Sequence, residues 1–306
     1  MTPALSIIIP TYNNAQFLER CIGSIMPVPS SVEIIVIDDG STDDTSQVLA
    51  GIPGLKIIEK KNGGVSSARN AGVKAATGGF VMYVDADDRL LPGGIDALMN
   101  GIQDFDADIV ILRSFNGAEE CYPWKKYFRE GMSYSSSGLM VHEYTRGSVW
   151  GCLYSRSFLT DNAIAFDERL SMAEDTVYFA NTQSVAKKIC FRDILLYEVI
   201  PREGSSSRGK DFAFLERYGK ALTSARESIA DSRMADFTIL NTLMGIVHVA
   251  ATAGYSASDV RKICPVDAVL PLSVTSFRRR KCLVRILNYS FSLFFGIKKW
   301  KDRIYG

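Results

Sequence analysis

The chain has little of the chemistry that binds zinc. Among its 306 residues are two histidines, His142 and His248, and none of the six cysteines stands in a CxxC pair. Zinc sites in proteins draw on clustered cysteine and histidine ligands, so the sequence predicts no zinc site. Unpaired, scattered cysteines also fit a reducing compartment.

Two glycine-rich spacings are missing as well. Neither GxGxxG nor GxxxxGK[ST] occurs, which argues against a dinucleotide site and a P-loop. The N-terminus has no basic residue ahead of its short apolar run, so no signal peptide is predicted, and we expect the catalytic part to stay in the cytoplasm. We find no internal repeat and no long linker. With 47% hydrophobic residues, the chain can bury one large α/β core, alone or with a smaller appended region.

The net charge of +1 conceals an asymmetry between two parts of the chain. Residues 278–306 contain nine basic residues and one acidic residue, a charge of +8. Residues 1–277 keep 26 basic and 33 acidic residues, a charge of −7. We therefore treat residues 278–306 as a basic tail that is distinct from the body.

Short apolar runs alternate with helical patterns through the first hundred residues. This βαβ order predicts an α/β fold with a mainly parallel, twisted sheet flanked by helices. No structure is predicted for residues 113–144, whereas residues 148–159 and 172–189 regain a pattern and residues 211–253 predict one or two helices. The expected strands cover residues 5–9, 33–37, 55–58, 80–84 and 108–112, and the expected helices cover residues 14–25, 42–50 and 65–76.

Carboxylates gather where the expected strands end. In DADD, Asp85, Asp87 and Asp88 follow a strand within four positions, and like charges this close need compensation by a cation or by hydrogen-bond donors. Hard divalent ions such as Mg²⁺ or Mn²⁺ take oxygen ligands and share them with phosphates. The alternative is structural: Asp88 would cap a helix that begins near Pro92.

The other motifs have similar alternatives. In DDGSTDDT, one of the residues 41–43 would make a good helix N-cap, but Asp38 and Asp39 at the strand end need another explanation. NGGVSSARNAG combines a turn with Arg69, which would otherwise lie on a solvated helix face. Glu174 and Asp175 would also favour a helix N-terminus through its dipole.

Taken together and in this order, the motifs resemble those of the family 2 glycosyltransferases. They are SIIIPTYN, VIDDGSTDDT, NGGVSSARNAG, YVDADD, VWGCLYSRSFL and AEDTVYF, and the resemblance covers about residues 4–205. It implies the A-type glycosyltransferase fold with a Rossmann-like nucleotide-binding half. The implied domains are a catalytic domain at 1–205 (nucleotide-sugar half 1–112, acceptor-side half 113–205), a helical C-terminal region at 206–277 and the basic tail at 278–306.

The resemblance also implies roles for individual residues. Asp87, with Asp88 beside it, would hold Mn²⁺ or Mg²⁺, and Asp175 in the Glu174–Asp175 pair would be the catalytic base. The match weakens after Leu196, so no role is predicted for Arg202 or Ser205. The residues expected to bind the nucleotide sugar are Pro10, Thr11, Tyr12, Asp38, Asp39, Arg69, Asp85, Ala86 and Trp150.

The implied activity is inverting transfer of a sugar, with a UDP-sugar as the expected donor. The acceptor would be a hydroxyl of a glycan or of a lipid-linked acceptor in cell-surface polysaccharide synthesis. One alternative is a nucleotidyltransferase, but a glycine-rich loop with Lys or Arg is missing after the first strand. Another is a non-catalytic binding module that keeps the fold, and the intact DADD and Glu174–Asp175 motifs argue against it.

The basic tail brackets an apolar stretch, residues 282–297, that is short and polar for a transmembrane helix. On a helix, Arg285 and Asn288 share one face and leave Phe291 and Phe295 largely to the other, which suits an interfacial helix on an anionic leaflet. The alternative is a helix packed on the enzyme body. The tail thus predicts a peripheral protein on the inner face of the cell membrane, and no nucleic-acid partner is expected.

Overall fold

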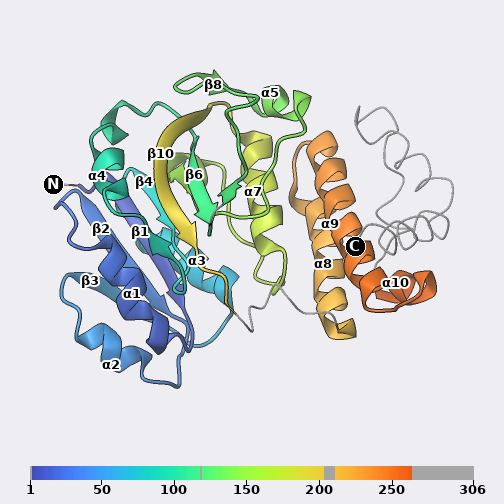
Figure 1. Ribbon diagram of the computed structural model, residues 1–306, viewed down its shortest axis with the longest axis horizontal. Coiled ribbons are helices and arrows are strands. Elements are labelled where there is room, and N and C mark those ends of the chain that lie inside the picture. The colour runs from blue at the N-terminus through green and yellow to red at the C-terminus, as the bar shows by residue number, and fades with distance from the viewer. Residues whose placement is uncertain (1, 118, 203–210, 264–306) are drawn as a thin grey trace. The chain divides into compact units, whose positions relative to one another are not determined.

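The computed structural model describes residues 2–117, 119–202 and 211–263 (Figure 1). The chain divides into two compact units. The first comprises Met1–His142, Ser148–Glu168 and Val185–Glu203, and the second comprises Glu143–Gly147, Arg169–Ser184 and Gly204–Gly306. The domain boundaries expected at residues 112, 205 and 277 stay predictions.

The first unit contains every strand of the described residues together with six α-helices and a short 3-10 helix. The strands are β1 (Leu5–Thr11), β2 (Val32–Asp38), β3 (Leu55–Glu59), β4 (Phe80–Tyr83), β5 (Arg89–Leu90), β6 (Ile109–Asn116), β7 (Glu119–Cys121), β8 (Ser133–Tyr134), β9 (Cys152–Ser155) and β10 (Ile189–Val199). The helices are α1 (Ala15–Ile25), α2 (Thr45–Ala50), α3 (Val65–Ala75), α4 (Gly94–Met99), η1 (Ile102–Asp104), α5 (Ser136–Val141) and α6 (Arg156–Asp161).

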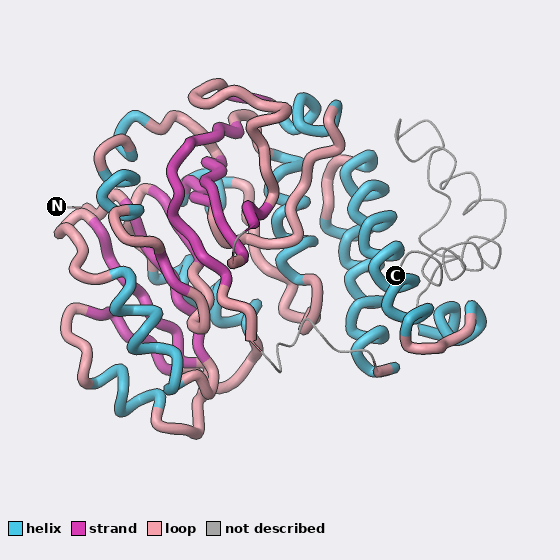
Figure 2. Tube along the Cα trace, in the orientation of Figure 1, coloured by secondary structure: helices cyan, strands magenta, loops and turns pink. Residues whose placement is uncertain are grey.

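These strands form one sheet in the order β3-β2-β1-β4-β9-β6-β10-β5, with β7 on β6 and β8 on β10 (Figure 2). β1 pairs in parallel with β2 and β4, and β2 pairs in parallel with β3. β9 lies antiparallel between β4 and β6, so the whole sheet is mixed. The α/β class and the parallel order of the first four strands, as predicted from the sequence, are confirmed.

Strand β1 is buried on both faces, which explains its nearly continuous apolar sequence. Ile7 belongs to the same buried cluster as Leu18 of α1, the helix that crosses in front of β1 in Figure 1. On the other face, a Cβ at Gly72 of α3 would lie 2.4 Å from Ile8 Cγ2. Only glycine therefore lets α3 approach β1 this closely.

Residues 113–144, for which no structure was predicted, fold around an aromatic cluster. Phe128 stacks on Phe191 of β10 with ring centroids 4.5 Å apart, and Trp124 lies 5.2 Å from the same ring. Tyr134 of β8 contacts Phe128 edge-on at 5.0 Å. Burial of these rings holds the segment, with its short elements β7, β8 and α5, against the sheet.

The described part of the second unit is helical, as predicted for the C-terminal region. α8 and α9 begin at Asp211 and Asp231, whose carboxylates accept backbone N–H bonds at 2.7 Å as N-caps. Arg226 of α8 pairs with Asp236 of α9 at 2.6 Å. The helices are α7 (Glu174–Val185, whose last residue belongs to the first unit), α8 (Phe212–Ser228), α9 (Ser232–Thr252) and α10 (Ala257–Ile263).

Among the described residues, α9 is the one helix that is long and apolar enough to cross a membrane. Because 67% of its most apolar stretch is buried within the protein, it has the burial of a core helix. The basic tail and its expected amphipathic helix lie outside the described residues, so the membrane anchor stays a prediction.

Candidate functional site

Three loops follow β1, β2 and β4, which are parallel neighbours, so the loops leave the same edge of the sheet. Asn13, in left-handed conformation with φ 51°, ties the first loop to the second. Its side-chain oxygen accepts the Thr42 N–H at 2.8 Å, and its own N–H donates to Ser41 Oγ at 3.0 Å. These bonds hold residues 41–44 as a loop, and α2 consequently begins at Thr45 rather than at the predicted residue 42.

Asp39 joins the end of β2 to the turn before α3. Its buried carboxylate accepts Lys60 Nζ at 2.5 Å, the Gly63 N–H at 3.0 Å and the Gly64 N–H at 2.7 Å. Asp38, also buried, accepts the Ser41 N–H at 2.9 Å. Both carboxylates therefore shape the loops around the strand ends, and the donor-binding role expected for them stays a prediction.

Next to Asp39, Thr11 presents a buried hydroxyl. Its carbonyl accepts the Asp39 N–H at 2.9 Å, whereas its Oγ1 has no hydrogen-bond partner in the part of the chain that the structure describes. Pro10 is buried, while Tyr12 is 47% exposed. A cavity of about 330 Å³ at the end of β2 is lined by Asp38, Gly40, Ser41, Ser46, Glu59, Lys60 and Lys61. The loops after β1 and β2 thus hold a buried hydroxyl without a partner among the described residues, an exposed ring and a cavity that Asp38 lines.

Arg69 of α3 is buried and pairs with Asp85 Oδ1 at 2.9 Å, the first carboxylate of DADD. Its guanidinium also lies 5.1 Å from the centre of the Phe166 ring. The neighbouring Asn70 fixes that ring, because its side chain accepts the Phe166 N–H at 2.8 Å and donates to the Phe166 carbonyl at 3.0 Å. Arg69, for which a solvated helix face was the alternative, is therefore buried in an ion pair with the DADD motif.

Each DADD carboxylate has a different partner. Beyond the Asp85–Arg69 pair, Asp87 Oδ2 lies 2.6 Å from Arg202 Nε, and Asp88 Oδ2 accepts the Tyr197 hydroxyl at 2.7 Å. Helix α4 begins after Gly93 and has no side-chain cap. The alternative that Asp88 caps this helix is therefore wrong. Ala86, between Asp85 and Asp87 in the sequence, is buried.

Burial and mutual repulsion raise the pKa values of two DADD carboxylates. Burial raises the pKa of Asp87, the charge of Asp85 raises it further, and Arg202 offsets part of this effect. Burial and Asp85 together raise the pKa of Asp88 to about 7. Since a nearby cation would favour the charged carboxylates, the cluster has the electrostatics of a cation-binding group.

Trp150 stacks on Tyr197, with ring centroids 5.2 Å apart and an interplanar angle of 11°. Because Tyr197 bonds to Asp88, Trp150 is connected to the DADD loop through one side chain. Glu174 and Asp175 form the first turn of α7 and belong to the second unit. The first unit thus brings together the predicted donor and metal residues, whereas the role of Asp175 as a base stays a prediction.

Some residues of this edge were not predicted from the sequence. Tyr197 and Arg202 lie at and after the carboxyl end of β10, where the family resemblance weakens, and Arg20 of α1 donates to the Asp87 carbonyl at 2.6 Å. Asn13 had a local signal, because asparagine tolerates left-handed backbone. Arg20 and Tyr197 had none, because their contacts join positions far apart in the sequence.

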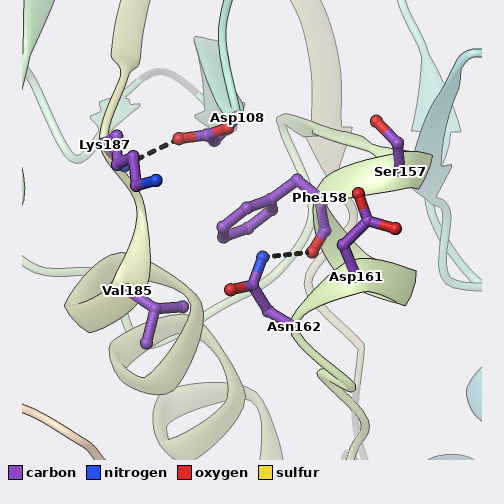
Figure 3. A pocket seen from close by; sticks show the side chains of 7 residues that line it. All are labelled: Asp108, Ser157, Phe158, Asp161, Asn162, Val185 and Lys187. Carbon is purple, nitrogen blue, oxygen red and sulfur yellow. Dashed lines mark hydrogen bonds between the residues drawn. The ribbon is translucent and has the colours of Figure 1, made fainter.

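A separate cavity of about 180 Å³ lies at the amino ends of β6 and β10, the opposite end of the sheet (Figure 3). In its lining, the Asp108 carboxylate accepts the backbone N–H of Lys187 at 2.7 Å, and the Asn162 side chain donates to the Phe158 carbonyl at 2.8 Å. These bonds are local loop and helix-end contacts. The cavity contains none of the predicted residues and is not the candidate site.

With the geometry established, the family can be assigned. The model of the family "Glycosyl transferase family 2" matches residues 6–159, half of the chain, and the chain belongs to this family. It is 29% identical over 219 residues to the uncharacterized glycosyltransferase EpsJ of Bacillus subtilis, covering 68% of this chain and 63% of EpsJ. It is also 29% identical over 212 residues to the chondroitin synthase of Pasteurella multocida, covering 63% of this chain and 21% of that enzyme.

Solved structures share the fold. The structure of S. aureus TarS 1–349 in complex with UDP-GlcNAc superposes with a TM-score of 0.69 at 20% identity, over 98% of this chain and 91% of that one. The mannosyltransferase PcManGT of Pyrobaculum calidifontis, in complex with GDP-Man and Mn²⁺, gives a TM-score of 0.53 at 16% identity, over 99% and 88%. At these identities the likeness concerns the fold alone.

Proposed function

We propose that this chain transfers a sugar from a nucleotide-sugar donor, a UDP-sugar, to a hydroxyl of a glycan or lipid-linked acceptor. The observation that carries the proposal is the convergence of the β1, β2 and β4 loops on one edge of the sheet. There Asp39, the Arg69–Asp85 pair and Asp87 stand at neighbouring strand ends. Ligands of open α/β sheets bind at the carboxyl ends of strands, where this group lies.

Several features support a UDP-sugar donor and a polysaccharide product. TarS was solved with UDP-GlcNAc, and one curated relative is a chondroitin synthase. In this chain, the unpartnered Thr11 hydroxyl and the exposed Tyr12 ring offer hydrogen bonding and stacking to a nucleotide base. Asp39 would take part in the same pocket, either directly or by holding the Gly63–Gly64 turn.

The residues of DADD fit a divalent cation. In the described residues no group of three or more His, Cys, Asp or Glu side chains is arranged to hold a metal. A site completed by the donor diphosphate needs only one or two carboxylates, and hard oxygen ligands suit Mn²⁺ or Mg²⁺. Burial, and after it the charge of Asp85, raise the pKa of Asp87, and a bound cation would relieve both effects. We therefore assign Asp87 as the ligand, and the bound ion would supply Lewis-acid stabilisation of the departing diphosphate.

The acceptor hydroxyl is a poor nucleophile at neutral pH and needs a general base within hydrogen-bond reach. We assign this role to Asp175, with Glu174 beside it, because the pair stands at the start of α7 in the motif that the family resemblance singled out. A single direct displacement from the face opposite the leaving group inverts the anomeric centre, as in inverting glycosidases.

A panel of nucleotide sugars tests the proposal. The purified full chain is incubated with each donor and Mn²⁺, and release of the nucleoside diphosphate is measured with and without glycan acceptors. We expect release from one UDP-sugar above the others, and loss of that release when a chelator removes the cation. Turnover of no nucleotide sugar, combined with no binding of UDP, would reject the proposal in favour of a non-catalytic relative.

A further inference from the structure

Three residues at and after the end of β10 contact the DADD loop: Tyr197, Ile200 and Arg202. The proposed function leaves them without a role. The Tyr197 hydroxyl donates to Asp88 Oδ2 at 2.7 Å and accepts the Asp85 N–H at 3.1 Å. The Ile200 N–H donates to Asp88 Oδ1 at 2.9 Å. Arg202 follows two residues later and reaches Asp87. One segment therefore contacts all three aspartates of the loop.

The carboxylate of Asp88 is fully hydrogen-bonded to the segment at the end of β10. Both of its oxygens accept hydrogen bonds from protein donors, one from a side chain and one from the backbone. The residue is 4% exposed, and Tyr197 is fully buried under the stacked ring of Trp150. To bind a cation directly, Asp88 would have to leave these bonds or share their lone pairs, so its geometry is that of a tether.

Asp87 is held in a different way. Arg202 Nε lies 2.6 Å from its carboxylate in an ion pair that both side chains leave partly open to solvent. The side chains are partly exposed, 37% for Arg202 and 23% for Asp87, and the guanidinium rests 5.2 Å from the Phe17 ring. Arg20 contacts the carbonyl of Asp87 and leaves its carboxylate available. Such a pair exchanges readily for a stronger cation.

We propose that the two neighbouring carboxylates have different tasks: Asp88 is a positioning residue that Tyr197 and Ile200 anchor to the end of β10, and Arg202 is the counter-ion that a divalent cation replaces on Asp87. The inference rests on the proposed function, because it concerns the same cation. The proposal predicts effects of opposite sign on cation affinity for Tyr197 and Arg202. Tyr197 supports cation binding by fixing the loop, whereas Arg202 opposes it by occupying the carboxylate.

The test measures the affinity of the full chain for Mn²⁺ with and without UDP. The electron paramagnetic resonance signal of the free ion reports how much Mn²⁺ is bound. Tyr197→Phe keeps the ring stack but removes the hydroxyl, and we expect it to weaken Mn²⁺ binding about tenfold, as for loss of an outer-shell partner. Arg202→Gln should tighten binding of Mn²⁺ alone by about threefold to fivefold, the effect of a partly exposed ion pair.

Two matched variants control for general effects. Arg89→Gln removes an arginine that directly follows DADD in sequence but pairs with Glu198 at 2.5 Å, and it should leave Mn²⁺ affinity unchanged. Tyr154→Phe removes another buried tyrosine hydroxyl, which donates to the Val149 carbonyl at 3.4 Å, and should behave likewise. A lowered melting temperature without a change in Mn²⁺ affinity for Tyr197→Phe would show a purely structural role.

A double-mutant cycle separates a tether from a ligand. If Asp88 acts through Tyr197, Asp88→Asn combined with Tyr197→Phe should weaken Mn²⁺ binding no more than the larger single effect. Additive losses would show Asp88 to be a direct ligand and overturn the assignment. Unchanged or weaker binding in Arg202→Gln would overturn the counter-ion role. If the parent chain binds no Mn²⁺ even with UDP, the metal part of the proposed function itself fails.

Discussion

At the scale of single residues, Asp87 and Asp88 show how neighbours in sequence acquire different surroundings. One faces a partly exposed guanidinium, and the other accepts bonds from a buried hydroxyl and a backbone amide. Buried, fully bonded groups are costly to displace, whereas an exposed ion pair contributes little free energy. The exchangeable position of the loop is therefore Asp87.

Replacement of the Asp87 carboxylate should remove the proposed cation ligand. Asp87→Asn keeps the size of the side chain but removes the charge, and we expect turnover with Mn²⁺ to fall at least about a hundredfold, the effect of losing a charge-stabilising group in a transition state. Turnover is measured as release of nucleoside diphosphate over a range of Mn²⁺ concentrations. A variant within a few-fold of the parent would contradict the assigned metal role.

The base at the start of α7 gives a different pattern. Asp175→Asn should lower transfer about a thousandfold or more, because the acceptor hydroxyl loses its general base. UDP affinity, measured by calorimetry, should stay nearly unchanged, since nucleotide binding does not need the base. Loss of UDP affinity in this variant would instead indicate a donor-binding or structural carboxylate.

At the scale of elements, α3 and β1 act as one body because of Gly72. Gly72→Ala places a methyl against Ile8, and we expect a loss of about 1–3 kcal/mol of unfolding free energy, as for an overpacked core. Since Arg69 lies on the preceding turn of α3, UDP affinity should fall as well. Gly23→Ala in α1, where no atom lies within 4 Å of the new Cβ, is the matched control and should stabilise by about 0.5–1 kcal/mol. Equal effects of both variants would contradict this account.

Glu33 of β2 ties the strand to the turn before β4 and gives the element a pH dependence. Its Oε1 accepts Ser6 Oγ at 2.6 Å, the Thr77 N–H at 2.7 Å and the Gly78 N–H at 3.1 Å. Burial opposes ionisation, but these bonds outweigh it and hold the pKa of Glu33 below its usual 4.5. The folded pKa thus lies below the unfolded one, so this stabilisation is complete above the unfolded pKa and is lost as pH falls through the folded value.

We therefore expect Glu33→Gln to cost about 1 kcal/mol at neutral pH, a modest figure because solvent screens this partly exposed group. Below the folded pKa of Glu33, which itself lies below 4.5, the parent and the variant should converge, because protonated glutamate and glutamine make similar bonds. Urea unfolding at neutral pH and at acidic pH measures both differences. A difference that stays constant between the two conditions would show that the charge of Glu33 does not stabilise the fold.

At the scale of the whole molecule, we propose that the basic tail associates the protein peripherally with the cytoplasmic face of a membrane. Each basic residue near an anionic surface would contribute on the order of 1 kcal/mol, screened by salt, and the Leu and Phe side chains expected on one face of the tail would add burial. Removal of residues 278–306 should abolish flotation with anionic liposomes and leave metal-dependent UDP binding intact, because the family motifs end near residue 205.

Flotation of the full chain and of the truncated chain, at low and high salt, decides the matter. Equal flotation of both chains, or none by either, would reject the anchor. A truncated chain that fails to fold would favour the alternative in which the tail packs on the body, a point that the described residues leave to experiment.

Local sequence determined most elements of the first hundred residues and the order of the polar motifs between them. The apolar runs of β1 and β2 and the polar loops after them define a parallel α/β sheet, since strand burial and loop chemistry are short-range properties of the chain. The same local signals put Asp39, Arg69 and the DADD carboxylates at strand ends, where the structure joins them.

Only the tertiary structure decided which partner each DADD carboxylate has. Asp88 could be a helix cap or a metal ligand by sequence, and its bonds to Tyr197 and Ile200 arise only because β10 ends beside the β4 loop. Likewise, β9 enters the sheet antiparallel between β4 and β6, which no local pattern specifies. Contacts between residues a hundred positions apart depend on the packing of the entire sheet, so periodicity and motif spacing contain no record of them.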